Sequence, residues 1–313
     1  MAEEALETLI GEVPEISEDH PLNLARAGVI GAGTMGRGIA QIFAANGIDV
    51  IILEKTEESL KNSLRKLSEE LDREINRWGM TSSEKRAILS RIRGTTDMEE
   101  ISEIKLIIEA APEILSLKKE LFTQIDRICR EDAILVSNTS ALSLSEIAAA
   151  TAHPEYVIGA HFMNPVPKTK LVEIVRGLST SDETFEYVKG VAERLDKTVV
   201  EVYEYPGYVT TRIILPMLNE AMYVLMEGVS TADGIDTAMK KGYNFPYGPL
   251  EFADMLGLDE VMNWMETLFH ELGDLKYRPC PFLRKLVRAG HLGKKTGQGF
   301  FKYDDMGKRK KED

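Results

Sequence analysis

Short apolar runs alternate with longer amphipathic segments over the first two thirds of the chain. The runs are rich in Ile, Val and Leu and are bounded by turn residues, so each of them predicts a buried strand. Segments with helical spacing separate most of these runs, which indicates an α/β fold with a doubly wound, mostly parallel sheet. The predicted strands are 26–30, 48–53, 92–96, 105–109, 133–137, 156–160, 171–175 and 197–202.

The alternation stops at residues 205–207, and every later segment has the spacing of a helix. A long apolar helix is predicted over 208–228, with a kink at Pro216. Ser230 and Asp233 predict the start of a second helix that ends at residue 242. A rigid turn and three further helices complete this half, and their predicted ranges are 245–249, 250–255, 259–272 and 281–289.

These patterns divide the chain into an α/β part and a helical part. The helical part is apolar on more sides than one small domain can cover, so we expect a homodimer that is buried through it. The predicted divisions are an acidic extension over 1–25, the α/β domain over 26–205, the helical domain over 206–304 and a charged tail over 305–313.

A helical arm over 57–91 interrupts the α/β part between its second and third strands. Its apolar residues are spaced three or four apart and predict one buried helix stripe, formed by Leu60, Leu64, Leu67, Leu71, Ile75 and Trp78. A shorter helix is predicted over 83–91. The cations of the arm either meet a phosphorylated ligand or form a solvated face, and the pattern leaves both interpretations open.

A glycine-rich turn follows the first predicted strand and opens a helix. It contains Gly31, Gly33, Thr34, Met35 and Gly36. The first glycine suits a tight turn, the second lets the backbone approach a pyrophosphate, and the third allows close packing of helix on strand. The N-terminus of the helix would then face the phosphates of a dinucleotide. This turn therefore predicts a Rossmann-type cofactor-binding domain.

Glu54 stands at the end of the second predicted strand, at the distance from the glycines that a dinucleotide site requires. A carboxylate at this position accepts hydrogen bonds from the ribose hydroxyls and repels a 2′-phosphate, so NAD is favoured over NADP. The adjacent Lys55 leaves residual use of NADP open. The predicted cofactor is NAD.

A histidine and a carboxylate are predicted to meet across two neighbouring strands. His161 follows the run 156–160, and Glu173 lies within the run 171–175. Pro165 and Pro167 make the connection between them irregular. A His beside a carboxylate is a candidate proton carrier near neutral pH, although taken alone the pair also suits a structural role.

Two further polar segments follow predicted strands, namely Pro112 with Glu113 and the Ser-Asn-Thr-Ser segment that begins at Ser137. Ligands of doubly wound sheets bind at the carboxyl ends of the strands. Because these segments, His161 and Asn164 collect at that edge, the edge is the predicted active site.

Composition excludes several classes of protein. The formal charge of −13 argues against a nucleic-acid partner. No apolar run is long enough for a membrane helix, and residues 1–25 lack a secretory pattern, so a cytoplasmic protein is expected. The two cysteines, Cys129 and Cys280, lie far apart without a ligand-like neighbour and predict packed thiols, with no disulfide and no metal site.

With these residues placed, the chain resembles the L-3-hydroxyacyl-CoA dehydrogenase family over residues 26–304, and it looks most like the bacterial 3-hydroxybutyryl-CoA dehydrogenases. Six segments carry the resemblance: Val-Ile-Gly-Ala-Gly-Thr-Met-Gly from Val29, Ser-Asn-Thr-Ser from Ser137, His-Phe-Met-Asn-Pro from His161, Pro-Gly-Tyr-Val from Pro206, Gly-Pro-Leu-Glu from Gly248, and Lys-Thr-Gly-Gln-Gly-Phe from Lys295. Their order along the chain makes the resemblance specific.

The resemblance implies an NAD-dependent oxidation of (S)-3-hydroxyacyl-CoA, and the reverse reduction of 3-ketoacyl-CoA. His161 is the implied catalytic base and Glu173 its orienting partner, while Ser137 and Asn164 are implied to contact substrate and nicotinamide. The residues implied to line the cofactor and acyl-CoA cleft are Glu113, Lys118 and Asn138. The helical domain is implied to form the dimer.

One position departs from the family pattern. Thr211 stands five residues after Pro206, where the family usually has an Asn that contributes to the substrate pocket. Thr keeps a hydroxyl but lacks the amide, so one hydrogen bond is lost or passes through water. Two alternatives stay open: a dehydrogenase of a free hydroxy acid, such as a sugar acid or carnitine, and a catalytically silent dinucleotide-binding protein.

Overall fold

The computed structural model describes residues 21–76, 79–304 and 307–310. The chain forms two compact units. The first contains the chain up to Thr139 together with Leu144–Tyr203, and the second contains Ser140–Ser143 and the chain from Glu204 onward. The main division therefore falls between Tyr203 and Glu204, close to the boundary that the sequence predicts.

In the described part of the chain, the first unit contains an eight-stranded sheet of order β3-β2-β1-β4-β5-β6-β7-β8. The first six strands pair in parallel, whereas β7 is antiparallel to β6 and β8 runs parallel to β7. The predicted α/β sheet is confirmed, with its last two strands reversed. The strands are β1 (Arg26–Ile30), β2 (Asp49–Leu53), β3 (Ile92–Thr95), β4 (Leu106–Glu109), β5 (Ile134–Ser137), β6 (Val157–Phe162), β7 (Leu171–Arg176) and β8 (Thr198–Tyr203).

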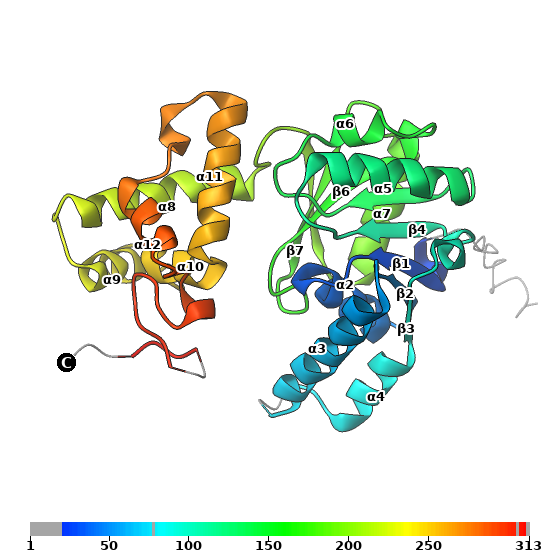
Figure 1. Ribbon diagram of the computed structural model, residues 1–313, viewed down its shortest axis with the longest axis horizontal. Helices are drawn as coiled ribbons and strands as arrows, with labels where there is room; N and C mark the ends of the chain where they lie inside the picture. Colours follow the sequence, from blue (N-terminus) through cyan, green and yellow to red (C-terminus); the bar gives the residue numbers. More distant parts are fainter. Residues whose placement is uncertain (1–20, 77–78, 305–306, 311–313) are drawn as a thin grey trace, which may run out of the picture. The chain divides into compact units, whose positions relative to one another are not determined.

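The α-helices of the first unit are α2 (Thr34–Ala45), α3 (Glu57–Asn76), α4 (Ser82–Ser90), α5 (Leu115–Ile128), α6 (Leu144–Ala148) and α7 (Asp182–Arg194). α3 and α4 form the predicted arm beside β3 (Figure 1). Leu60, Leu67 and Leu71 are buried, as the predicted stripe requires, while Trp78 lies outside the described residues. Thr81 begins α4 with a capping box to Glu84, because its hydroxyl accepts the Glu84 N–H.

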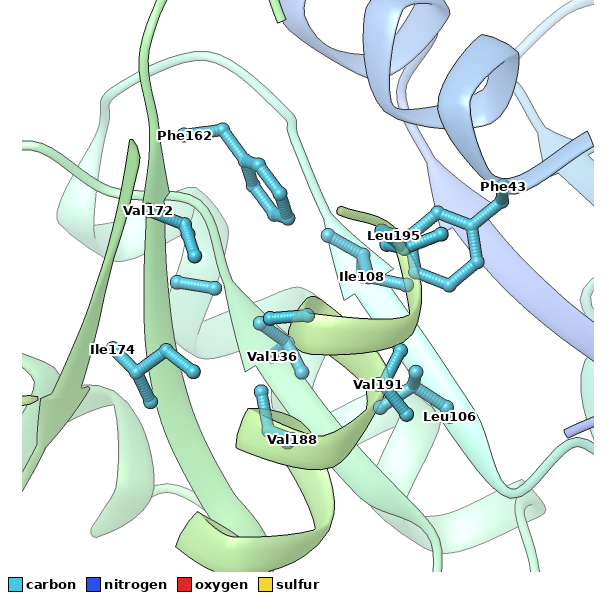
Figure 2. A pocket seen from close by; sticks show the side chains of 12 residues that line it. Phe43, Leu106, Ile108, Val136, Phe162, Val172, Ile174, Val188, Val191 and Leu195 are labelled. Atoms are coloured by element: carbon cyan, nitrogen blue, oxygen red, sulfur yellow. The ribbon is translucent and has the colours of Figure 1, made fainter. Parts of the chain in front are cut away.

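An apolar core lies between the sheet and the helices α2 and α7. Figure 2 shows Phe43 of α2 and Val191 of α7 facing strand residues that include Val136 and Phe162. They surround a cavity of ≈ 20 Å³ that apolar side chains line, so the cavity is a dry packing void. Neighbouring strand residues point to opposite faces, so the side chain of His161 lies on the other face of the sheet from Phe162.

The second unit is helical, as predicted. Pro216 lies inside its first helix. Thr231, and neither Ser230 nor Asp233, caps the next helix, because the extended backbone at Thr231 directs its hydroxyl to the N–H of Gly234 and Asp233 is already helical. Its helices in the described residues are α8 (Thr210–Met226), α9 (Ala232–Gly242), α10 (Pro249–Leu256), α11 (Leu258–Leu272) and α12 (Pro281–Arg288).

Two buried carboxylates tie this helical unit together. Asp236 of α9 accepts the N–H groups of Leu250 and Glu251 at 2.9 and 3.0 Å, at the start of α10. Asp254 of α10 accepts the N–H groups of Phe300 and Phe301, both at 2.9 Å. These structural contacts within the helical unit therefore explain the sequence segments that begin at Gly248 and Lys295.

The N-terminal end of the described chain is held against α7. Pro21–Asn23 form a 3-10 turn, and Arg194 donates to the carbonyls of Pro21 and Leu24 at 3.3 and 2.9 Å. The extension and the tail that the sequence predicts otherwise fall largely outside the described residues, at 1–20, 305–306 and 311–313. Within the described ranges, none of the helices has the length and apolar character needed to cross a membrane.

Candidate active site

The glycine turn after β1 has the geometry that a dinucleotide requires. Gly31 has φ +84°, and a Cβ on Gly36 would lie 1.8 Å from the carbonyl oxygen of Gly31. Only glycine satisfies these two positions. A Cβ on Gly33 would meet nothing within 4 Å, so this position faces open space beside the first turn of α2. Thr34 and Met35 begin that helix, and Thr34 is exposed at its N-terminus.

Glu54 follows β2 and reaches the same turn. Its Oε1 accepts the N–H of Ala32 at 2.7 Å, and its Oε2 accepts the hydroxyl of Ser59 at 2.9 Å. The carboxylate is therefore fixed beside the glycine turn, where ribose hydroxyls would bind. Together with the open space at Gly33, this arrangement fits NAD.

Arg37 fastens the glycine turn to the arm. Its guanidinium donates to the carbonyl of Ala32 at 3.0 Å and forms two hydrogen bonds with Glu70 of α3, at 3.0 and 2.7 Å. Arg37 is buried, whereas the Glu70 side chain is 32% exposed, and bidentate geometry makes such a contact strong. Sequence analysis missed Arg37 because its partners lie 5 and 33 residues away and belong to no recognised spacing.

A buried network lies at the carboxyl ends of β4 and β5. Glu109, the last residue of β4, accepts the Lys118 ammonium at 2.7 Å and the Ser137 hydroxyl at 2.8 Å. All three side chains are almost fully buried. The signal for Glu109 in the sequence is a single charge that closes an otherwise apolar strand, and sequence analysis did not use it.

Glu113 extends this network toward the surface. One of its oxygens lies 3.5 Å from the Lys118 Nζ, and the other accepts the hydroxyl of Thr139 at 2.6 Å. The structure thus brings together Glu113, Lys118 and Ser137, which the sequence proposed separately. The hydroxyl of Ser137 is directed at Glu109, so its contact with substrate stays a prediction.

His161 and Glu173 occupy directly opposed positions on β6 and β7. The Nδ1 atom of His161 lies 2.7 Å from Oε2 of Glu173, and the carboxylate is completely buried. Because Nδ1 faces a carboxylate, it carries a proton and Nε2 is the ring nitrogen that can accept one. The predicted proximity of this pair is confirmed.

Asn138 supports the strand that carries the histidine, because its side-chain oxygen accepts the N–H of Phe162 at 3.2 Å. Asn164 is exposed in the loop after β6. Thr211 is buried in the first turn of α8, within the second unit. The roles predicted for Asn138, Asn164 and Thr211 toward ligands stay predictions.

These features define a class of protein. A glycine turn after β1, a carboxylate after β2 and a buried His–Glu pair on the same sheet are the parts of a dinucleotide-dependent dehydrogenase. The NAD-binding domain of the 3-hydroxyacyl-CoA dehydrogenase family matches residues 26–205, and the C-terminal domain of that family matches residues 207–303. The chain therefore belongs to the 3-hydroxyacyl-CoA dehydrogenase family.

Similar proteins agree with this membership. The chain is 48% identical over 277 residues to a probable 3-hydroxybutyryl-CoA dehydrogenase of Bacillus subtilis, covering 88% of this chain and 96% of the relative. It is 39% identical to the mitochondrial hydroxyacyl-coenzyme A dehydrogenase of Homo sapiens, with 88% and 90% covered. The crystal structure of (S)-3-hydroxybutyryl-CoA dehydrogenase from Ralstonia eutropha matches with TM-score 0.83 and 42% identity, over 90% of this chain and all (100%) of that chain.

Proposed function

We propose that the protein oxidises a short-chain (S)-3-hydroxyacyl-CoA with NAD and reduces the 3-ketoacyl-CoA in the reverse direction. The observation that carries this proposal is the 2.7 Å pair of His161 and Glu173 on the NAD-binding sheet. The relatives that are named for 3-hydroxybutyryl-CoA support a short acyl chain.

In this mechanism His161 moves the proton. Its Nε2 accepts the proton of the substrate's 3-hydroxyl group during oxidation and returns it during reduction. Glu173 fixes the tautomer in which Nδ1 is protonated, and it stabilises the imidazolium that forms. Bound NAD supplies the hydride acceptor. A general base placed in this way contributes about 10²- to 10⁴-fold in rate.

Other residues of the site hold the two reactants. Gly33 leaves room for the pyrophosphate, and Glu54 accepts the ribose hydroxyls. Glu113 lines the cofactor site, and the buried Lys118, which Glu109 holds, orients it there. Asn138 lies beside this network. Asn164 contacts the acyl substrate.

The test is NADH consumption with acetoacetyl-CoA by the wild type and by His161→Ala. The expected result is turnover by the wild type and a loss of about 10²-fold or more in the variant, with the binding of NADH unchanged. An inactive wild type would refute the substrate class. A His161→Ala protein with near-normal turnover would refute the proton route. Free 3-hydroxybutyrate with NAD serves as the matched substrate control, and turnover on it would favour a hydroxy-acid dehydrogenase.

We also propose that the protein forms a homodimer through the helical unit. Its proposed location is the cytoplasm. Large apolar side chains of this unit are exposed in the single chain, including Ile213, Val229, Tyr243 and Leu275. Contact with another chain would remove these apolar side chains from water. A second copy of the chain suits them, because twofold dimers are the commonest assemblies of soluble proteins.

A further inference from the structure

The reversal of the last two strands brings an unexpected residue to the active-site edge. Because β7 and β8 run opposite to β6, they begin at the edge where β6 ends. Lys197 immediately precedes β8. It therefore lies beside the loop 163–170, which joins the strand of His161 to the strand of Glu173.

The ammonium group of Lys197 is held by this loop. Its Nζ donates to the carbonyls of Val166 and Thr169, both at 2.6 Å. The side chain is 8% exposed. Burial lowers the pKa of the Lys197 ammonium, with a smaller contribution from the nearby Lys170. A buried charge is retained against such a penalty only where its hydrogen bonds are good, and here the loop backbone supplies them.

The buried Val166 anchors the loop in the apolar core, and the backbone of the loop makes few hydrogen bonds of its own. Pro165 and Pro167 lack N–H groups, so neither can donate a backbone hydrogen bond. Within the loop, the N–H groups of Lys168 and Thr169 both donate to the carbonyl of Pro165, at 3.0 and 3.1 Å. The Lys197 ammonium thus joins the two sides of one turn, and the exposed Asn164 stands at the start of that turn.

We propose that Lys197 is a positioning residue for the reaction: its ammonium fixes the turn at 165–169 and thereby sets the position of Asn164, which follows His161 by three residues. The proposal rests on the proposed function for its catalytic consequence. Its structural consequence, the order of the turn in the free protein, can be measured without any substrate.

The decisive variant is Lys197→Met, which keeps the length of the side chain and removes the donor. Hydrogen exchange at the amides of Lys168 and Thr169 should accelerate about tenfold or more, because the turn can then open while the rest of the protein stays folded. The kcat with acetoacetyl-CoA should fall about tenfold, since small misplacements of contact groups are costly to rate, while KM for NADH stays within about twofold. Lys197→Arg should recover part of kcat.

A double variant separates positioning from general destabilisation. In an Asn164→Ala background, Lys197→Met should lower kcat by less than about twofold, because the group that it positions is already absent. Lys105→Met is the matched control. Lys105 donates to the carbonyl of Asp132 at 2.7 Å but precedes β4 at the opposite edge of the sheet, so its loss should leave kcat unchanged.

The outcomes distinguish this proposal from the proposed function. Unchanged exchange at Lys168 and Thr169 in Lys197→Met overturns the role of Lys197, whatever the substrate is. Equal losses of kcat with and without Asn164 overturn it as well. An inactive wild type instead refutes the proposed function and leaves the exchange result to decide the positioning role. If Lys197→Met does not fold, Lys197→Gln, which keeps a shorter neutral donor, replaces it in each comparison.

Discussion

Glu173 in the α/β unit and Asp254 in the helical unit are both almost completely buried carboxylates, yet they contact different partners. Glu173 faces the ring of His161, a side chain that can change its protonation state. Asp254 faces two backbone N–H groups and the hydroxyl of Tyr303, none of which changes charge near neutral pH.

This difference in partners distinguishes a carboxylate with a catalytic role from one with a structural role. A buried carboxylate beside a titratable ring can stabilise the charge that appears during a reaction. A buried carboxylate that accepts hydrogen bonds only from groups of unchanging charge stabilises the fold, because removing it leaves those donors unsatisfied. We therefore expect changes at Glu173 to act on turnover and changes at Asp254 to act on stability.

The largest effect is expected for Glu173→Gln. The amide can donate to Nδ1 of His161, which favours the wrong tautomer of the ring and withdraws the negative charge. The kcat for acetoacetyl-CoA reduction should fall about 10³-fold, while the denaturant midpoint changes little. Steady-state kinetics and urea unfolding of the same preparation test both statements. Loss of stability with normal kcat would place Glu173 with Asp254 as an architectural residue.

A smaller effect, of the opposite kind, is expected for Asp254→Ala. Phe300, Phe301 and Tyr303 would each lose an acceptor in the core of the helical unit. Leaving buried donors unsatisfied costs about 1–3 kcal/mol for each group before relaxation, so we expect about 3 kcal/mol less free energy of unfolding. Urea unfolding measures this loss. At low temperature the folded variant should keep the kcat of the wild type, and a large loss of kcat would contradict the comparison.

The fold could be predicted from the sequence to the extent that strands are apolar and bounded by turn residues. The direction of β7 was not predicted, although the chain contains a signal for it. Only residues 163–170 separate β6 from β7, and a parallel connection needs a dozen or more residues. Connection length, rather than apolar pattern, determines the direction of this strand.

The site residues could be predicted where their chemical role requires a fixed spacing along the sequence. Gly31, Gly33 and Gly36 have a required spacing, and His161 and Glu173 lie on strands whose pairing follows from the fold. Lys197 could not be found in this way, because its acceptors are backbone carbonyls 31 and 28 residues earlier, in a loop without periodicity. Contacts to backbone atoms of an irregular segment leave no pattern of side-chain types.

The smallest effect is a dependence of stability on pH that Asp254 should produce. Burial raises the pKa of Asp254 from 3.8 to about 6 in the folded protein, with the nearby Asp236 acting in the same direction. Between about pH 4 and pH 6 the folded state therefore binds this proton more tightly than the unfolded state does. The stabilisation from this group is complete below the unfolded pKa and is lost as the pH rises through about 6.

The free energy of unfolding of the wild type should thus fall by on the order of 2 kcal/mol, relative to Asp254→Asn, between pH 4 and pH 7. Urea unfolding of both proteins across this range measures the difference, and parallel curves would show that Asp254 stays ionised in the folded protein.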